Sequence, residues 1–130
     1  MKKVLIVDDY EDIHEILTFV LQDEQITVKC LTSASQLKAT LQEWQPNLLM
    51  LDVRLGEADG RSICDELKAD PLYQDLKITL MSAMADGWRD QPCQADAKID
   101  KPFEIDEVRA LILDLLGLNT DVQHLAFKNY

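Results

Sequence analysis

The chain has 130 residues and a formal net charge of −11, from 13 basic and 24 acidic side chains. This length suits about one domain with a substantial core. The charge argues against direct binding to nucleic acid or to an anionic membrane surface, because these partners attract clustered Lys and Arg, and the sequence contains no such cluster. The acidic excess either keeps a small protein soluble or includes carboxylates that converge on a metal ion.

The sequence also indicates a cytoplasmic protein. No apolar run approaches the ~20 residues that a membrane-spanning helix needs. Only four apolar residues separate Lys3 from Asp8, too few for a signal peptide. The three cysteines, Cys30, Cys64 and Cys93, are widely spaced, which argues against a disulfide framework or a zinc site. We expect Cys30 and Cys64 to be small buried side chains.

Short apolar runs, typical of buried strands, alternate with apolar stripes at helical spacing. They predict strands at 4–7, 26–31, 48–51, 78–81 and 97–100. Between and after these strands they predict helices over 13–21, over 33–44, from 60 to before Pro71, and over 105–116. Gly117 is expected to end the last helix.

Two local patterns add detail to these elements. Ser33 and Gln36 resemble a capping box at the start of the second helix. His14 and His124 have no partner at metal-ligand spacing. We expect each histidine to lie half-exposed on a helix.

Two segments have weaker patterns. Residues 86–94 contain a glycine and a proline, so a helix there is expected to be short or irregular. The tail, 118–130, either extends the last helix or forms a linker. We expect residues 1–117 to form the domain.

Strands that alternate with helices predict an α/β fold with a doubly wound, five-stranded parallel sheet. Ligands of such sheets bind outside the carboxyl ends of the strands. Polar residues follow or end four of the five predicted strands: Asp8 and Asp9, then Asp52, Ser82 and Lys101. Alone, each has an ordinary explanation, such as a helix cap, a turn residue or a surface lysine. Together they predict a site at one edge of the sheet.

Three carboxylates at this edge would repel one another by roughly 3–4 kcal/mol per pair at an effective dielectric constant near 20. A divalent cation offsets this repulsion, and oxygen ligands favour Mg²⁺. Lys101 adds a positive charge on the other side. Such a site can hold a phosphoryl group, with a carboxylate such as Asp52 as the nucleophile.

These residues resemble the receiver domain of two-component response regulators, the CheY-like family. The resemblance covers about residues 2–117. It rests on an ordered set of motifs: Asp8-Asp9, Asp52, Asp59-Gly60, Ser82-Ala83 and Lys101-Pro102-Phe103. It implies strand order 2-1-3-4-5.

The resemblance also implies residue roles. Asp52 would accept a phosphoryl group from a phosphohistidine of a sensor histidine kinase or a histidine phosphotransfer protein. Mg²⁺ would bind Asp8 (through a water), Asp9, Asp52 and the backbone carbonyl of Arg54. Lys101, Ser82 and the backbone N–H groups of Ala83 and Arg54 would contact the phosphoryl oxygens. The outcome would be a switch in binding to a downstream protein, and Lys101-Pro102 would be cis.

Two positions depart from the family pattern. Lys98 stands where family members often carry an aromatic switch residue, and Gly56 stands where proline is common. The second departure predicts a looser loop after Asp52.

Two other functions fit parts of the pattern. A receiver-like interaction module that is never phosphorylated would keep the fold, and Lys98 favours it. A small Mg²⁺-dependent phosphohydrolase would use the same residue types. A haloacid-dehalogenase-type enzyme, however, would need an Asp-x-Asp loop after the first strand, where this chain has adjacent Asp8 and Asp9.

Overall fold

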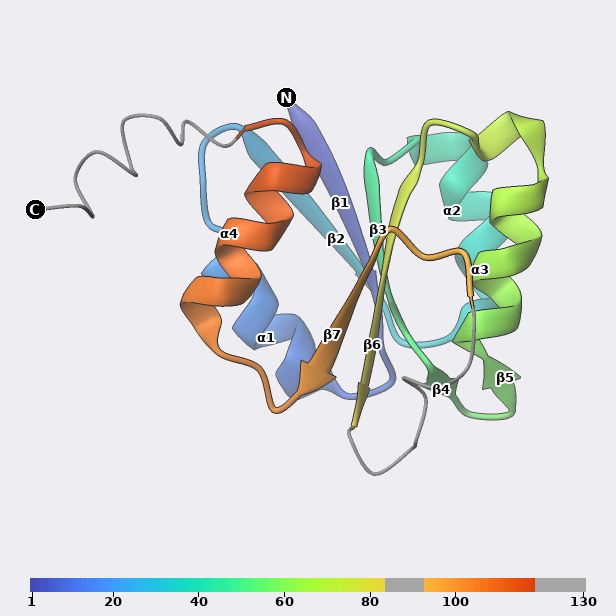
Figure 1. The fold of residues 1–130 in the computed structure, drawn as a ribbon, viewed down its shortest axis with the longest axis horizontal. Helices are drawn as coiled ribbons and strands as arrows, with labels where there is room; N and C mark the ends of the chain where they lie inside the picture. The colour runs from blue at the N-terminus through green and yellow to red at the C-terminus, as the bar shows by residue number, and fades with distance from the viewer. Residues whose placement is uncertain (84–92, 119–130) are drawn as a thin grey trace, which may run out of the picture.

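The computed structural model describes residues 1–83 and 93–118, which form a layered α/β fold (Figure 1). A five-stranded sheet has the order β2-β1-β3-β6-β7, and every neighbouring pair is parallel. Its strands are β1 (Lys2–Val7), β2 (Ile26–Leu31), β3 (Leu48–Asp52), β6 (Lys77–Ala83) and β7 (Ala97–Lys101). Counting only these strands along the chain gives the expected order 2-1-3-4-5, so the predicted fold class is confirmed.

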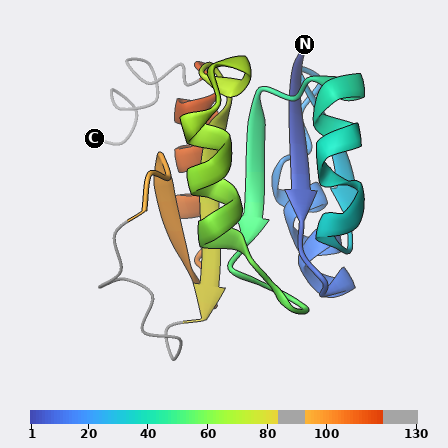
Figure 2. The same cartoon turned by 90° about the vertical axis from the view of Figure 1, so that its right-hand side faces the viewer.

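Helices cover both faces of this sheet. Helices α1 (Glu11–Val20) and α4 (Ile105–Leu115) lie on one face, and α2 (Leu37–Trp44) and α3 (Gly60–Ala69) lie on the other (Figures 1 and 2). Two single-turn 3₁₀ helices, η1 (Ala34–Gln36) and η2 (Pro71–Tyr73), complete the helical segments of the described residues.

The core has two halves, one under each helical layer. Alternate residues of a strand point to opposite faces, so Leu49 and Leu51 pack on the α2–α3 side while Leu48 and Met50 pack on the α1–α4 side. All five residues of β3 are buried. This explains why the strand has no polar alternation before its final aspartate.

The predicted ends of two helices are confirmed. Helix α3 ends at Ala69, directly before Asp70-Pro71. Gly117 follows α4 with a φ of 70°, and the N–H of Leu118 donates to the carbonyl of Leu113 at 2.9 Å. The left-handed conformation at Gly117 is a common helix stop because glycine adopts it without steric cost.

Three predictions about local structure are wrong. Ser33 makes no capping hydrogen bond with its side chain; its hydroxyl lies 2.8 Å from that of Ser35, and α2 starts only after the η1 turn. Cys30 is exposed because β2 is an edge strand, whereas Cys64 is buried as expected. His14 is buried rather than half-exposed, and its ring is hydrogen-bonded to the carbonyl of Asp8 at the end of β1.

The loop after Asp52 contains a short hairpin that the sequence did not predict. Strands β4 (Arg54–Leu55) and β5 (Ala58–Asp59) pair in the antiparallel direction. Gly56 has a φ of 61° at its turn. Proline cannot adopt this conformation, so glycine suits the turn and proline would not.

Several expectations fall on residues outside the described part of the chain. The expected irregular helix at 86–94 falls mostly within 84–92, and most of the tail, with His124, falls within 119–130. Within the described ranges, no helix is long and apolar enough to cross a membrane.

Candidate functional site

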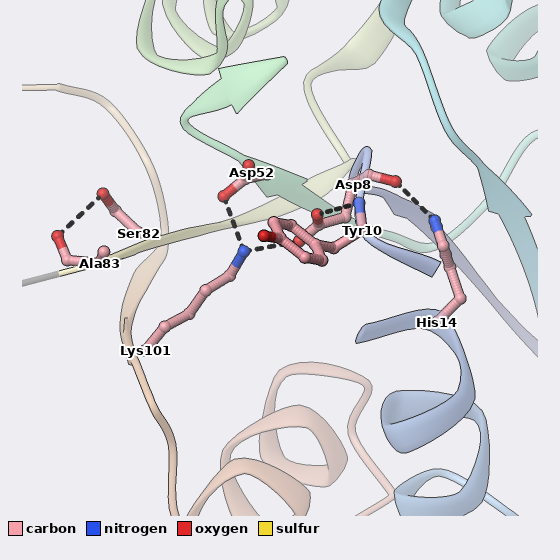
Figure 3. Close-up of polar contacts among 7 residues, drawn as sticks. All are labelled: Asp8, Tyr10, His14, Asp52, Ser82, Ala83 and Lys101. Carbon is pink, nitrogen blue, oxygen red and sulfur yellow. Dashed lines mark hydrogen bonds and ion pairs between the residues drawn. The ribbon is translucent and has the colours of Figure 1, made fainter. Parts of the chain in front are cut away.

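The fold brings the predicted site residues to one edge of the sheet. Asp8 and Asp9 follow β1 directly, and Asp52 is the last residue of β3. Ser82 and Ala83 end β6, and Lys101 ends β7. In a parallel sheet these carboxyl ends lie side by side, so residues far apart in the sequence meet there (Figure 3).

Lys101 connects two of the carboxylates. Its Nζ lies 2.7 Å from Asp8 Oδ2 and 3.1 Å from Asp52 Oδ1 (Figure 3). Asp8 is fully buried and Asp52 is 7% exposed. Buried carboxylates need a partner of opposite charge, and Lys101 is the partner of both.

The carboxylates of Asp8, Asp9 and Asp52 form a compact acidic cluster. One oxygen of each lies within 4.8 Å of the others, and Asp9 is the exposed member. Hard oxygen ligands in this arrangement suit Mg²⁺, which is commonly held by one or two carboxylates and water molecules. The residues present therefore fit the metal that the sequence predicts.

The environment at this edge shifts the pKa values of Asp52 and Lys101. Burial, followed by the negative charge of Asp8, raises the pKa of Asp52 to about 6, although Lys101 acts in the opposite direction. Burial alone would lower the pKa of Lys101, but its hydrogen bonds to Asp8 and Asp52 outweigh this and raise it. Lys101 thus stays positive while Asp52 is costly to ionise, a cost that a bound cation relieves.

Two contacts that the sequence does not predict hold Asp8 in place. The backbone N–H of Tyr10 donates to Asp8 Oδ1 at 2.9 Å, and His14 Nε2 lies 2.6 Å from the Asp8 carbonyl oxygen (Figure 3). Neither contact has a sequence motif, because both depend on how α1 leaves the end of β1.

Gly60 lies against the backbone at the end of β3. Its N–H donates to the carbonyl of Val53 at 2.8 Å. A Cβ atom at this position would overlap the carbonyl oxygen of Asp52. The Asp59-Gly60 motif thus allows α3 to start against the backbone that carries the central carboxylate, while the Asp59 side chain accepts from the N–H of Arg61 and caps the helix.

A cavity of about 460 Å³ opens beside these residues. It is lined by Asp9, Tyr10, Asp12, Ile13, Asp52, Arg54, Ala83 and Lys101. Ser82 is 1% exposed, and its hydroxyl donates to the Ala83 carbonyl at 3.3 Å (Figure 3). Asp52 is therefore reachable from solvent, with Ser82 at the next strand end.

The sequence profile of the response regulator receiver domain matches residues 4–113, most of the chain. The chain belongs to the response regulator receiver domain family. This family membership agrees with the fold and with the acidic edge of the sheet. It supports a role in phosphorylation-dependent two-component signalling and does not favour the phosphohydrolase or the unphosphorylated module.

Individual relatives support the same assignment. The chain is 29% identical over 120 residues to the DNA-binding response regulator MtrA of Mycobacterium tuberculosis, covering 92% of this chain and 53% of MtrA. It is 28% identical over 119 residues to the DNA-binding dual master transcriptional regulator RpaA of Synechocystis, covering 89% of this chain and 49% of RpaA. The chain thus spans about half the length of these curated relatives.

Solved structures agree on the fold. The signal receiver domain of a signal transduction histidine kinase from Syntrophus aciditrophicus superposes with a TM-score of 0.80 at 25% identity, covering 90% of this chain and 91% of that chain. Lys98, which departs from the family pattern, is exposed on β7 opposite Leu80 of β6.

Proposed function

We propose that Asp52 accepts a phosphoryl group from a phosphohistidine on a sensor histidine kinase or a histidine phosphotransfer protein. The observation that carries this proposal is the position of the Asp52 carboxylate: it is almost buried, paired with Lys101, adjacent to two further carboxylates and on the wall of an open cavity. A purely structural aspartate would not need this combination.

The reaction is a simple displacement at phosphorus. A carboxylate oxygen of Asp52 forms the new O–P bond, the P–N bond to the donor imidazole breaks, and the imidazole nitrogen keeps the electron pair and is protonated. Lys101 holds Asp52 in place beforehand and then compensates the negative charge of the transferred group.

Asp8, Asp9 and Asp52, with the backbone carbonyl of Arg54, are the residues that would hold Mg²⁺, and Asp8 would act through a water molecule. When bound, Mg²⁺ supplies positive charge that neutralises the phosphoryl oxygens.

Residues at the next strand end complete the site. The Ser82 hydroxyl, now turned to the Ala83 carbonyl, would rotate to donate to a phosphoryl oxygen. The backbone N–H groups of Ala83 and Arg54 would donate to the others. In this scheme the domain promotes its own phosphorylation and dephosphorylation and acts on no separate substrate.

The output is a change in binding to a downstream protein. The net charge of −11 disfavours direct contact with nucleic acid, even though the named relatives are DNA-binding regulators. We place the receiver in residues 1–117 and treat 118–130 as a tail or linker. A cytoplasmic location fits a phosphohistidine donor of this class.

The test is incubation with phosphoramidate and Mg²⁺, followed by intact mass measurement. We expect a gain of one phosphoryl group in the wild type and none in Asp52→Asn. Asp106→Asn, a matched change at an exposed aspartate of α4, should be phosphorylated like the wild type. No adduct in the wild type would favour the unphosphorylated module, and continuous phosphate release without an adduct would favour the hydrolase.

A further inference from the structure

His14 reaches the site through the backbone of Asp8. Its Nε2 lies 2.6 Å from the Asp8 carbonyl oxygen, and the residue is 8% exposed (Figure 3). A carbonyl oxygen only accepts hydrogen bonds, so Nε2 carries the proton and donates. Helix α1 therefore supplies a buried donor to the end of β1.

The carbonyl in this hydrogen bond belongs to the peptide group that joins Asp8 to Asp9. Because a peptide group is planar, fixing this oxygen also fixes the nitrogen of Asp9 and the direction in which Asp9 leaves the strand. The Asp8 side chain is held separately, by the N–H of Tyr10 and by Lys101 Nζ. His14 is thus the contact that orients the link between the two acidic residues.

The imidazole carries a cost that an apolar residue would avoid. Its Nδ1 is buried and has no hydrogen-bond partner among the described residues. A buried polar atom without a hydrogen-bond partner lowers the stability of the folded protein. The other buried residues of α1, Leu17 and Val20, are apolar. A residue that lowers stability and lies next to a polar site is typical of a residue with a role in that site, and His14 is such a residue.

We propose that His14 is a positioning residue for the metal site. Its Nε2–H holds the Asp8–Asp9 peptide group so that the three carboxylates, now within 4.8 Å of one another, stay arranged for one cation. This inference rests on the proposed function in taking that cation to be Mg²⁺.

The first test compares His14→Leu with His14→Gln. Leucine removes the donor and fills the space, whereas the glutamine amide keeps an N–H donor. Titration with MgCl₂, followed by amide NMR shifts, should give an affinity about tenfold weaker for His14→Leu. His14→Gln should recover most of it. At saturating Mg²⁺, the rate of phosphorylation by phosphoramidate should approach the wild-type rate in both variants.

Controls separate positioning from packing. Leu17→Val, on the same buried face of α1, should lower the stability of the metal-free protein but leave Mg²⁺ affinity unchanged. In EDTA, His14→Leu removes the unpartnered Nδ1 but also leaves the Asp8 carbonyl without this donor. These two effects on stability oppose each other, so its urea midpoint should stay close to that of the wild type. If it fails to fold, His14→Asn, whose amide is too short to reach the carbonyl, replaces it in the comparison with His14→Gln.

Two results of the Mg²⁺ titrations would overturn the inference: wild-type Mg²⁺ affinity in His14→Leu, or equal weakening in His14→Gln and His14→Leu while both are folded. A metal-free readout is the imidazole ¹⁵N spectrum, which should show the proton on Nε2; a proton on Nδ1 alone would also contradict the assignment. Failure of the proposed function alone would give a different result. The wild type would gain no phosphoryl group, but Mg²⁺ would still bind more weakly to His14→Leu than to the wild type.

Discussion

Asp52 is ionised only at a cost in the metal-free protein. Burial and the neighbouring Asp8 raise its pKa to about 6, from an ordinary value of 3.8. The folded state therefore binds a proton more tightly than the unfolded state does, and this group makes the protein less stable as the pH rises from about 4 to about 6. The free-energy cost of ionisation thus falls on Asp52, the residue that accepts the phosphoryl group in the proposed reaction.

Asp52→Asn should consequently stabilise the metal-free protein at pH 7, by about 1–3 kcal/mol, because a neutral side chain of the same size removes the cost of ionisation. The gain should largely disappear at pH 4, where the wild-type carboxyl is protonated in the folded state. Urea unfolding in EDTA at the two pH values measures both effects. Equal changes at both pH values would show that Asp52 is not strained by its charge.

In the presence of Mg²⁺, the wild type should become more stable than Asp52→Asn. Added ion binds the folded wild type and raises its free energy of unfolding, whereas Asp52→Asn lacks one of the three carboxylates and should gain less. Melting curves over an MgCl₂ series provide the measurement. An identical shift in both proteins would contradict the assignment of Asp52 to the metal site.

Thr79 is a second residue with an unfavourable environment. It is fully buried in β6, and its hydroxyl has no hydrogen-bond partner among the described residues. Thr79→Val keeps the shape and removes the buried hydroxyl, so we expect about 1 kcal/mol of added stability in urea unfolding. Thr27→Val, at an exposed position of β2, should change stability by less than about 0.5 kcal/mol. A loss of stability in Thr79→Val would mean that the hydroxyl is satisfied.

At the scale of elements, the site depends on α3 starting very close to the end of β3. Gly60→Ala would push a methyl group into the Asp52 carbonyl, so the backbone must shift. We expect a loss of about 1–3 kcal/mol in stability and slower phosphorylation by phosphoramidate.

The hairpin supplies a matched control for Gly60. Gly56→Ala is strained because φ is 61°, yet nothing lies within 4 Å of the added Cβ. It should cost about 1 kcal/mol and leave the rate of phosphorylation unchanged. Equal rates in both variants would contradict the role assigned to Gly60.

The elements also show what could be predicted from sequence. The strands were predictable because residues buried on both faces leave an uninterrupted apolar run, and the site followed because the polar residues begin where these runs end. Ser33, Cys30 and His14 were misjudged because their environments are set by partners elsewhere: the η1 turn, the edge position of β2 and the Asp8 carbonyl. A window of sequence does not contain those partners.

At the scale of the whole molecule, the residues that stabilise the fold and the residues of the proposed site lie in different places. Two apolar cores lie under the helical layers, and the proposed reactive groups gather at the carboxyl ends of the strands. Of the 24 acidic residues, three form the cluster at this edge, while Lys101 supplies the opposing charge. The geometry thus supports the proposal that Asp52 is the centre of the site.

The most direct test of this account is to locate the phosphoryl group. After treatment with phosphoramidate and Mg²⁺, borohydride reduction converts an aspartyl phosphate to homoserine, which peptide mass spectrometry assigns to a position. We predict homoserine at position 52, in amounts that fall strongly when EDTA replaces Mg²⁺. Modification at another aspartate, or the same yield without the metal, would contradict the central claim.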